Sequence, residues 1–463
     1  MSRSCISPDA ILRQLALCQS IQARLPEHPL AYVASYGCQQ NEADSERLRG
    51  YLQTMGFSFV QEPEGADLVL LNTCAIRQHA EQRVFGNVGA LRHTKRRKPG
   101  QKIVVCGCMA QQPHAADRLR TSFPYVDLVF GPQELWRFPE LLLQRLDSGK
   151  RVFATQDVPG TVSEGIPVVR GSGVKAWVSI MYGCNNFCSY CVVPYVRGRE
   201  RSREPEYILQ EIRALAQEGY REITLLGQNV NSYGKDLDSG QDFAWLLEQV
   251  DAIPGDFILR FMTSHPKDAS PRLFDVMARG EKIAPALHLP FQSGSSRVLK
   301  AMNRGYTREH YLSLITQLRQ RIPNVVLTSD VIVGFPGETQ AEFEETLSLI
   351  ETVKFDALFT FLFSPRKGTP AEGLEDPMPA QQKQQNFQRL LETQNGISAL
   401  KHHAYVGKTL PCLVDGTDEK GNPIARTRGG RLVHLNGPAL PEGTWADVTI
   451  TAASTWALFG SIN

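Results

Sequence analysis

The sequence has no hydrophobic run long enough to cross a membrane and no strong excess of charge. No stretch approaches the ~18 consecutive apolar residues of a transmembrane helix, so we expect no membrane span. The first apolar stretch, residues 11–17, is interrupted by Arg13 and Gln14, and no small-residue cleavage pattern follows it, so we expect no signal peptide and a cytoplasmic location. The formal net charge is only +2. Internal repeats and low-complexity tracts are also missing, which excludes a repeat architecture.

The remaining bulk properties are those of a multidomain globular protein. A chain of 463 residues predicts two to four domains with ample buried core. Apolar residues make up 42% and charged residues 21%, which is ordinary for a soluble protein. Ten cysteines without a secretory signal indicate a reducing compartment and metal ligation, and argue against disulfides.

Three of these cysteines lie on one short loop. Cys184, Cys188 and Cys191 form a C-x3-C-x2-C pattern. Three thiolates at this spacing can hold a 4Fe–4S cluster and leave its fourth iron without a protein ligand, and an open metal position favours catalysis. The alternative is a structural zinc loop with a distant fourth ligand, but zinc loops more often show two CxxC pairs.

Three further cysteines follow predicted strands of an N-terminal α/β region, residues 30–147. Strands are expected at 31–35, 67–71 and 102–106, with helices at 41–55, 76–92 and after residue 111. Cys38, Cys74 and Cys108 each come directly after one strand. Because parallel strands end at one edge of a sheet, these three thiols are expected to converge. They would hold a second cluster, or they are simply buried thiols.

The other cysteines do not fit either group. Cys106 is only two residues before Cys108, but it lies inside the strand, so we prefer Cys108, which follows Gly107. Cys5, Cys18 and Cys412 are interpreted as free thiols.

Four further segments complete the predicted organisation. Residues 1–29 are a leader of unknown role with one amphipathic helix at 9–25, and residues 148–173 are a linker that includes Pro159 and Gly160. Six βα units between 174 and 402 predict a partial (β/α)6 barrel, with strands at 177–181, 222–226, 257–262, 286–291, 325–333 and 357–363. Short β segments separated by turns predict a small β-barrel at 403–463, a fold that often binds RNA.

The motifs resemble those of a known family. The loop Gly183–Cys191 resembles the cluster loop of radical S-adenosylmethionine (SAM) enzymes. Segments 36–46, 72–77 and 107–111 resemble the N-terminal domain of methylthiotransferases, and the C-terminal segment resembles the TRAM-like RNA-binding barrel that ends these enzymes. The resemblance also covers segments 226–234, 263–267, 289–295, 329–339 and 363–370. The fold class is therefore expected to be α/β, with a parallel sheet domain, a radical SAM barrel and a small β-barrel.

The resemblance implies 2-methylthio transfer to N6-isopentenyladenosine next to the anticodon of tRNA, with two SAM molecules and two 4Fe–4S clusters. Segment 228–234 is most similar to the branch with that substrate. The cluster at Cys184, Cys188 and Cys191 would bind SAM and yield a 5′-deoxyadenosyl radical, which can remove a hydrogen from the unactivated C2 position. The cluster at Cys38, Cys74 and Cys108 would carry the sulfur.

The resemblance also assigns two weaker groups of residues. Cofactor binding is expected at strand ends, at Gly227, Gln228, Asn229, Ser264, Gln292, Gly334 and Glu338. The glycines are equally compatible with tight turns. Phosphate binding by tRNA is expected at Arg197, Arg199, Arg201 and Arg203, and a solvated arginine face is the alternative. His265 precedes Pro266 and fits a turn-shaping role.

The implied partners are tRNA, a reducing electron donor of the flavodoxin or ferredoxin type, and iron–sulfur assembly or sulfur-donor proteins, with the chain acting as a monomer away from membranes. Two other functions stay open. One is methylthiolation of threonylcarbamoyl-adenosine in tRNA or of a ribosomal protein. The other is a non-catalytic iron–sulfur RNA-binding module, which four protein ligands per cluster would favour.

Overall fold

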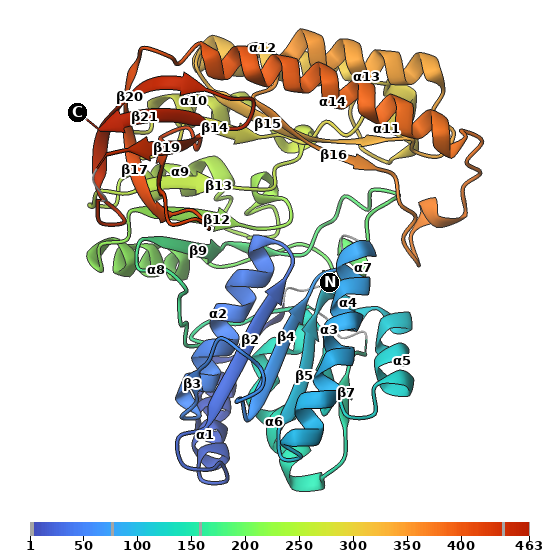
Figure 1. Cartoon of the computed structure of the whole chain (residues 1–463), viewed down its shortest axis with the longest axis vertical. Helices are drawn as coiled ribbons and strands as arrows, with labels where there is room; N and C mark the ends of the chain where they lie inside the picture. Colours follow the sequence, from blue (N-terminus) through green and yellow to red (C-terminus); the bar gives the residue numbers. More distant parts are fainter. Residues whose placement is uncertain (1–3, 76–77, 157–159, 438–439, 463) are drawn as a thin grey trace.

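The computed structural model describes residues 4–75, 78–156, 160–437 and 440–462. An N-terminal sheet domain forms one end of the molecule, and a central domain with a C-terminal barrel on its side forms the other (Figure 1). Ile76, Arg77 and Pro159, which the sequence interpretation included in a motif or the linker, lie outside the described residues. Among the described helices, none combines the length and the apolar character that a membrane crossing needs.

The N-terminal sheet is parallel throughout, with the strand order β3-β2-β4-β5-β6-β7. β4 is buried along its whole length, as expected for a central strand covered on both faces. The strands are β2 (Leu30–Tyr36), β3 (Ser58–Phe59), β4 (Leu68–Thr73), β5 (Lys102–Gly107), β6 (Leu128–Phe130) and β7 (Val152–Ala154).

Helices cover both faces of this sheet and enclose two apolar cores. They are α1 (Pro8–Gln22), α2 (Gln39–Thr54), α3 (Gln78–Arg97), α4 (Cys108–Gln111), α5 (Pro113–Ser122), the 3-10 helix η1 (Pro132–Arg137) and α6 (Phe138–Ser148). Ser7 caps the start of α1, where its side chain accepts from the Ala10 N–H, and the helix buries Cys18 and Ile21 in the first core. The strands and helices predicted around Cys38, Cys74 and Cys108 are therefore present.

The boundaries of this domain differ from the sequence expectation in two places. The proposed linker 148–173 starts too early, because β7 pairs with β6 inside the sheet. The described part of the leader belongs to this domain, because α1 packs in the domain core and β1 (Ser4–Cys5) pairs with β8 (Thr161–Val162). Strands of two or three residues are too short to show a periodicity in the sequence.

The central domain contains the six predicted strands in chain order, arranged as two parallel three-stranded halves. A single bridge between Leu259 and Ile283 joins the halves, which gives an open arc. The strands are β9 (Lys175–Ser179), β12 (Glu222–Leu226), β13 (Ile258–Phe261), β14 (Ala286–His288), β15 (Val326–Val333) and β16 (Ala357–Leu362). β10 (Met181–Tyr182) and β11 (Arg201–Ser202) form a separate antiparallel pair.

The helices of this domain pack around the arc and share its large apolar core. They are α7 (Val193–Arg197), α8 (Pro205–Gln217), α9 (Phe243–Asp251), α10 (Pro271–Arg279), α11 (Ser296–Ala301), α12 (Arg308–Arg321), α13 (Gln340–Val353) and α14 (Ala380–His403), with 3-10 turns η2 (Val230–Ser232), η3 (Pro266–Asp268) and η4 (Pro370–Gly373). Thr339 and Glu342 form a capping box at the start of α13, which fixes the end of the preceding loop.

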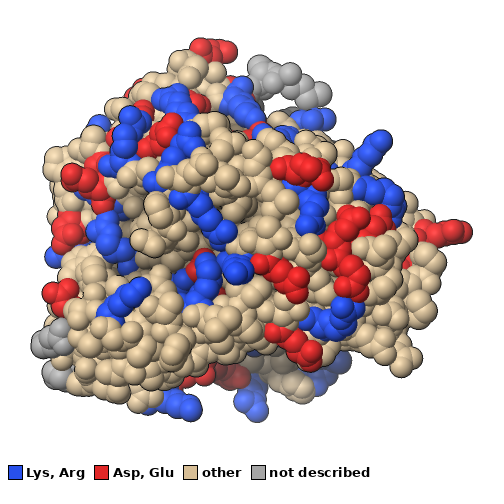
Figure 2. Space-filling model, turned by 90° about the horizontal axis from the view of Figure 1, so that it is seen from above, with Lys and Arg blue, Asp and Glu red and all other residues tan. Residues whose placement is uncertain are grey.

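The C-terminal segment is a closed antiparallel and parallel barrel of order β17-β18-β19-β21-β20. Its strands are β17 (Thr409–Thr417), β18 (Pro423–Thr427), β19 (Leu432–Asn436), β20 (Trp445–Ala453) and β21 (Leu458–Ile462). Buried Asp356 of the central domain pairs with Arg431 of the barrel and with Lys401 of α14, which anchors the barrel. Basic and acidic side chains are interspersed over the face shown in Figure 2.

Candidate active site between two cysteine triads

The first triad lies on a loop between β10 and α7. Gly183 begins the loop with φ of +77°, and a side chain there would clash with the Arg199 carbonyl oxygen. The loop folds back on the following segment, since Cys184 donates its backbone N–H to the Gly198 carbonyl at 3.1 Å. Phe187, between the cysteines, also has a left-handed φ of +47°. The close approach explains why a glycine must precede Cys184.

Burial dominates the electrostatics of this loop. It raises the pKa of Cys184 and of Cys191 to about 12 each. Arg304 lies near the third thiol, with Nη1 3.5 Å from Cys188 Sγ. Metal binding would therefore have to displace protons from Cys184 and Cys191.

The second triad lies at the ends of β2, β4 and β5. A side chain at Gly37 would come within 2.5 Å of Cys74 Cβ, so glycine permits the close approach of two strand ends. The Cys74 thiol donates to Cys38, and this hydrogen bond, with help from Arg197, lowers the pKa of Cys38 to about 6. Burial raises the pKa of Cys108, while Arg197 opposes that shift. The predicted convergence of the three strand ends is present in the structure.

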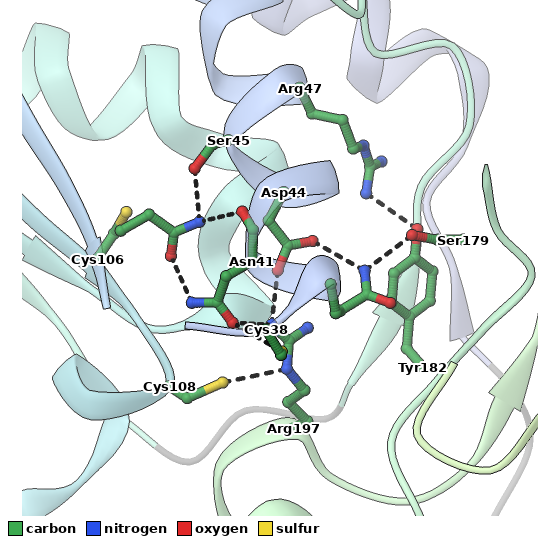
Figure 3. A network of polar contacts seen from close by, with 12 residues as sticks. Cys38, Asn41, Asp44, Ser45, Arg47, Cys106, Cys108, Ser179, Tyr182 and Arg197 are labelled. Carbon is green, nitrogen blue, oxygen red and sulfur yellow. Dashed lines mark hydrogen bonds and ion pairs between the residues drawn. The ribbon is translucent and has the colours of Figure 1, made fainter. Parts of the chain in front are cut away.

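Cys106 does not belong to this group. It packs in the apolar core beneath the sheet with Leu70 and Val104. Cys108 instead contacts Ala75, Val192 and Val196 at the junction with α7, and Figure 3 shows the two sulfurs pointing apart. Cys108 therefore lies at the strand-end edge and Cys106 in the core, and the role of Cys108 as a cluster ligand stays a prediction.

No three His, Cys, Asp or Glu side chains in the described part of the chain are arranged to hold one metal ion. A cubane cluster makes a different demand, because each of its cysteine ligands binds a different iron. The convergent thiols and the low pKa of Cys38 are the features of this structure that fit such a group.

Unpaired polar atoms line the strand ends of the central domain. Asn229 Oδ1, Ser264 Oγ, Gln292 Oε1 and Glu338 Oε1 are buried without a hydrogen-bond partner, although buried polar groups are normally satisfied. All four belong to the residues expected to bind the cofactor. Thr263 and Gln292 also have left-handed φ values of +71° and +65°, a strain that is typical of functional sites. This edge of the arc fits a polar ligand with several hydrogen-bonding groups, as SAM is.

The other expected cofactor residues have contacts within the protein. Gln228 Oε1 accepts from the Gly183 N–H at 2.5 Å, so its side chain supports the cysteine loop. A side chain at Gly227 would lie 2.6 Å from Met181 Cγ, and Gly334 has φ of +73° with Lys383 close by. Glu338 caps the Gly334 N–H through Oε2, and burial raises its pKa to about 7.

The structure corrects the expectation for the arginine run. Arg197, Arg201 and Arg203 are only 4%, 7% and 7% exposed, so they cannot meet an RNA phosphate in this structure. Arg203 pairs with Glu164 and Glu211, and Arg201 donates to the carbonyls of Arg197 and Arg199. Only Arg199 is exposed, where it lies over the Phe187 ring at 4.8 Å. In an irregular segment, the alternation of arginines along the sequence does not show which of their side chains are buried.

Several contributors were missed from the sequence. Arg304 contacts Cys188, and Arg366 lies near Cys74, whose charge acts on its pKa. His265 has a buried, unpaired Nε2, while its Nδ1 accepts from the Lys267 N–H at 3.2 Å. Arg366 lies within segment 363–370, but no spacing marked it, and Arg304 carried no signal at all. The turn-shaping role expected for His265 agrees with its bond to Lys267, whereas its unpaired Nε2 could not be foreseen.

Comparison with known families agrees with this division of the chain. Residues 178–350 match the radical SAM superfamily, residues 30–131 match uncharacterized protein family UPF0004, and residues 403–462 match the TRAM domain. Among solved structures, the fold is similar to the radical S-adenosylmethionine methyltransferase TsrM from Kitasatospora setae, with a TM-score of 0.55 and 14% identity over 85% of this chain and 84% of that chain.

Curated relatives are similar over nearly the full length. A tRNA-2-methylthio-N(6)-dimethylallyladenosine synthase from Acetivibrio thermocellus is 46% identical over 99% of this chain and 97% of its own. Proteins of the same name from Clostridium botulinum (strain Okra / Type B1) and Desulforamulus reducens are each 48% identical, over 93% and 94% of this chain and 96% and 95% of their own. The resemblance and the fold class expected from the sequence are therefore confirmed, and the chain belongs to the radical SAM methylthiotransferases, in the tRNA-2-methylthio-N6-dimethylallyladenosine synthase group.

Proposed function

We propose that this protein adds a methylthio group to C2 of N6-isopentenyladenosine next to the anticodon of tRNA. The single observation that carries the proposal is a cavity beside Cys191 of one cysteine triad, whose wall includes Arg366, the arginine on which the charge of Cys74 in the other triad acts. Relatives that match this chain over nearly their full length bear the name of this activity. The rest of the argument concerns what the side chains of this chain would do.

A cavity of about 250 Å³ lies beside Cys191. Its apolar wall includes Ile332, Phe361 and Phe363, which suit a flat base and a prenyl group. Arg366 also lines it, and the charge of Cys74 acts on this arginine. The cavity is therefore bordered by one triad and linked through Arg366 to the other. We propose that the target adenosine enters here.

The residues of the chain have separable tasks in this proposal. Cys184, Cys188 and Cys191 would hold one cluster, and Cys38, Cys74 and Cys108 the other. Asn229, Ser264, Gln292 and Glu338 would hold SAM through their unpaired atoms. When bound, the clusters and SAM supply radical chemistry and sulfur, which no protein side chain provides. Cys74, Cys108 and Cys188 are buried, and Cys38, Cys184 and Cys191 are partly buried, so the protein would shield much of each cluster from water.

The remaining roles are proposals of the same kind. Arg199 would contact tRNA near the cluster loop, and the C-terminal barrel would contribute further RNA affinity. A flavodoxin or ferredoxin type donor would supply electrons, and iron–sulfur assembly or sulfur-donor proteins would restore the clusters. We propose that the chain works as a cytoplasmic monomer.

The decisive experiment is mass spectrometry of tRNA nucleosides from cells with and without this protein. Loss of 2-methylthio-N6-isopentenyladenosine, with accumulation of N6-isopentenyladenosine, is expected, and the wild-type gene should reverse both changes. A variant with Cys38, Cys74 and Cys108 replaced by Ala is the matched control and should not restore the nucleoside. Loss of a methylthiolated threonylcarbamoyl-adenosine instead would contradict the proposed substrate.

A further inference from the structure

Arg197 belongs to one domain by sequence and to the other by contact. It ends α7, six residues after Cys191, so it is part of the segment that carries the first triad. Its side chain is 4% exposed and lies at the ends of β2 and β5, in the second triad. Figure 3 shows the guanidinium between the α2 side chains and Cys108.

The guanidinium contacts the second triad directly. Its Nε donates to Cys108 Sγ at 3.1 Å. Its Nη2 donates to Asp44 Oδ2 at 2.7 Å and to Asn41 Oδ1 at 3.3 Å. Asn41 Oδ1 in turn lies 3.5 Å from Cys38 Sγ. One side chain from the first loop is therefore joined to two of the three thiols of the other triad.

This contact sets Arg197 apart from its neighbours in the arginine run. Arg201 and Arg203 are equally buried, but their hydrogen bonds go to carbonyl, amide and carboxylate oxygens. Arg197 instead brings a positive charge and an N–H donor to a sulfur in a site that excludes water, where a charge acts strongly. Asp44 balances part of that charge, because a buried arginine without a partner is very costly.

Hydrogen bonds to cysteine sulfur and nearby charge are the main means by which a protein sets the potential of an iron–sulfur cluster. We propose that Arg197 is a positioning residue that raises the reduction potential of the cluster held by Cys38, Cys74 and Cys108 and joins it to the loop of the other triad. The inference rests on the proposed function only in requiring a cluster at this triad. Asp44 offsets part of the charge of Arg197, so replacing Asp44 should shift the reduction potential in the opposite direction.

The test uses full-length protein with Cys184, Cys188 and Cys191 replaced by Ala, so that only the second cluster is present. Arg197→Gln, Arg197→Lys and Asp44→Asn are added separately. After anaerobic reconstitution, iron content and the midpoint potential are measured by a redox titration followed by electron paramagnetic resonance. Arg213→Gln, which removes an exposed arginine of α8, is the control for net charge.

Arg197→Gln should shift the midpoint to more negative potential, since it removes the positive charge and the Nε–H that donates to Cys108. Arg197→Lys should give a smaller shift in the same direction, Asp44→Asn a shift to more positive potential, and Arg213→Gln none. Asp44→Asn keeps the test decisive if Arg197→Gln loses iron. Two outcomes overturn the role of Arg197. The first is full iron content with unchanged midpoint potentials in both the Arg197 and the Asp44 variants. The second is loss of iron in Arg197→Gln together with an unchanged midpoint potential in Asp44→Asn. A parent variant that binds no iron overturns the second cluster itself, and with it the proposed function.

Discussion

The two cysteine triads bring three thiols together in different ways. Cys184, Cys188 and Cys191 lie within eight residues of one another on a single loop, whereas Cys38, Cys74 and Cys108 are brought together by three parallel strands. Burial raises the pKa of Cys184 and Cys191, while a neighbouring thiol and Arg197 lower the pKa of Cys38. The first triad and its contacts Gln228 and Arg304 all belong to the central domain, whereas the second site is built from both domains. Damage to the domain interface should therefore affect the second site more.

Removal of each triad should have the largest and most distinct effects. Wild-type protein should bind about eight irons and each triple-Ala variant about four. The variant lacking Cys184, Cys188 and Cys191 should form no 5′-deoxyadenosine. The variant lacking Cys38, Cys74 and Cys108 should still cleave SAM with dithionite but form no methylthio product. Iron analysis and mass detection of both products check this. Methylthio-adenosine from the second variant would refute the separation of roles.

Substitution of two glycines, one beside each triad, should damage each triad separately. In Gly183→Ala the new methyl group would clash with the Arg199 carbonyl, and in Gly107→Ala it would lie 2.5 Å from the Thr73 carbonyl oxygen. Both glycines also have left-handed φ, which costs a non-glycine residue ~1–2 kcal/mol. Each variant should lose about half of its iron, from its own triad only. Gly149→Ala, at a left-handed position with free space, is the control. Equal loss from both triads in either variant would contradict their independence.

The exposed and the buried arginines of the run should respond differently to substitution by alanine. Exposed Arg199→Ala should raise the KM for tRNA several-fold with little change in tRNA-independent SAM cleavage, and the effect should shrink at high salt. Buried Arg203→Ala should instead lower stability by ~3–5 kcal/mol, because Glu164 loses its ion pair with Arg203 and Glu211 keeps only its pair with Arg170. Steady-state kinetics and thermal unfolding check both. An unchanged tRNA KM in Arg199→Ala would remove it from the RNA interface.

Glu338 gives the smallest expected effect, a pH dependence of the apoprotein. Burial raises its pKa from 4.5 to about 7, so the folded state binds a proton more tightly than the unfolded state. Its contribution to stability is full below pH 4.5 and is lost as pH rises to 7, a change of about 3 kcal/mol. Glu338→Gln should flatten the melting temperature between pH 5 and 8. A melting temperature that rises between pH 5 and 8 in the wild type, but not in Glu338→Gln, would contradict the raised pKa of Glu338.

Much of the fold and part of the site followed from local patterns. The six βα strands, the helices after each N-terminal strand and the small barrel were predicted from apolar periodicity and turn residues. The extra strands β3, β6 and β7 were missed, since they have only two or three residues each. The choice of Cys108 over Cys106 also came from sequence, because a residue after the strand can reach the edge that the strand interior cannot.

The sequence alone determined which cysteines group together, because ligand spacing on a loop and position after a strand are properties of the chain order. Tertiary structure alone decided what surrounds them. It buried Arg201 and Arg203 against oxygen partners, exposed Arg199, and carried Arg197 across the domain junction to Cys108. It also left Asn229, Ser264, Gln292 and Glu338 with unpaired atoms on one edge. Burial and partner choice depend on which distant segments pack together, and four arginines at alternate positions look alike until that packing is known.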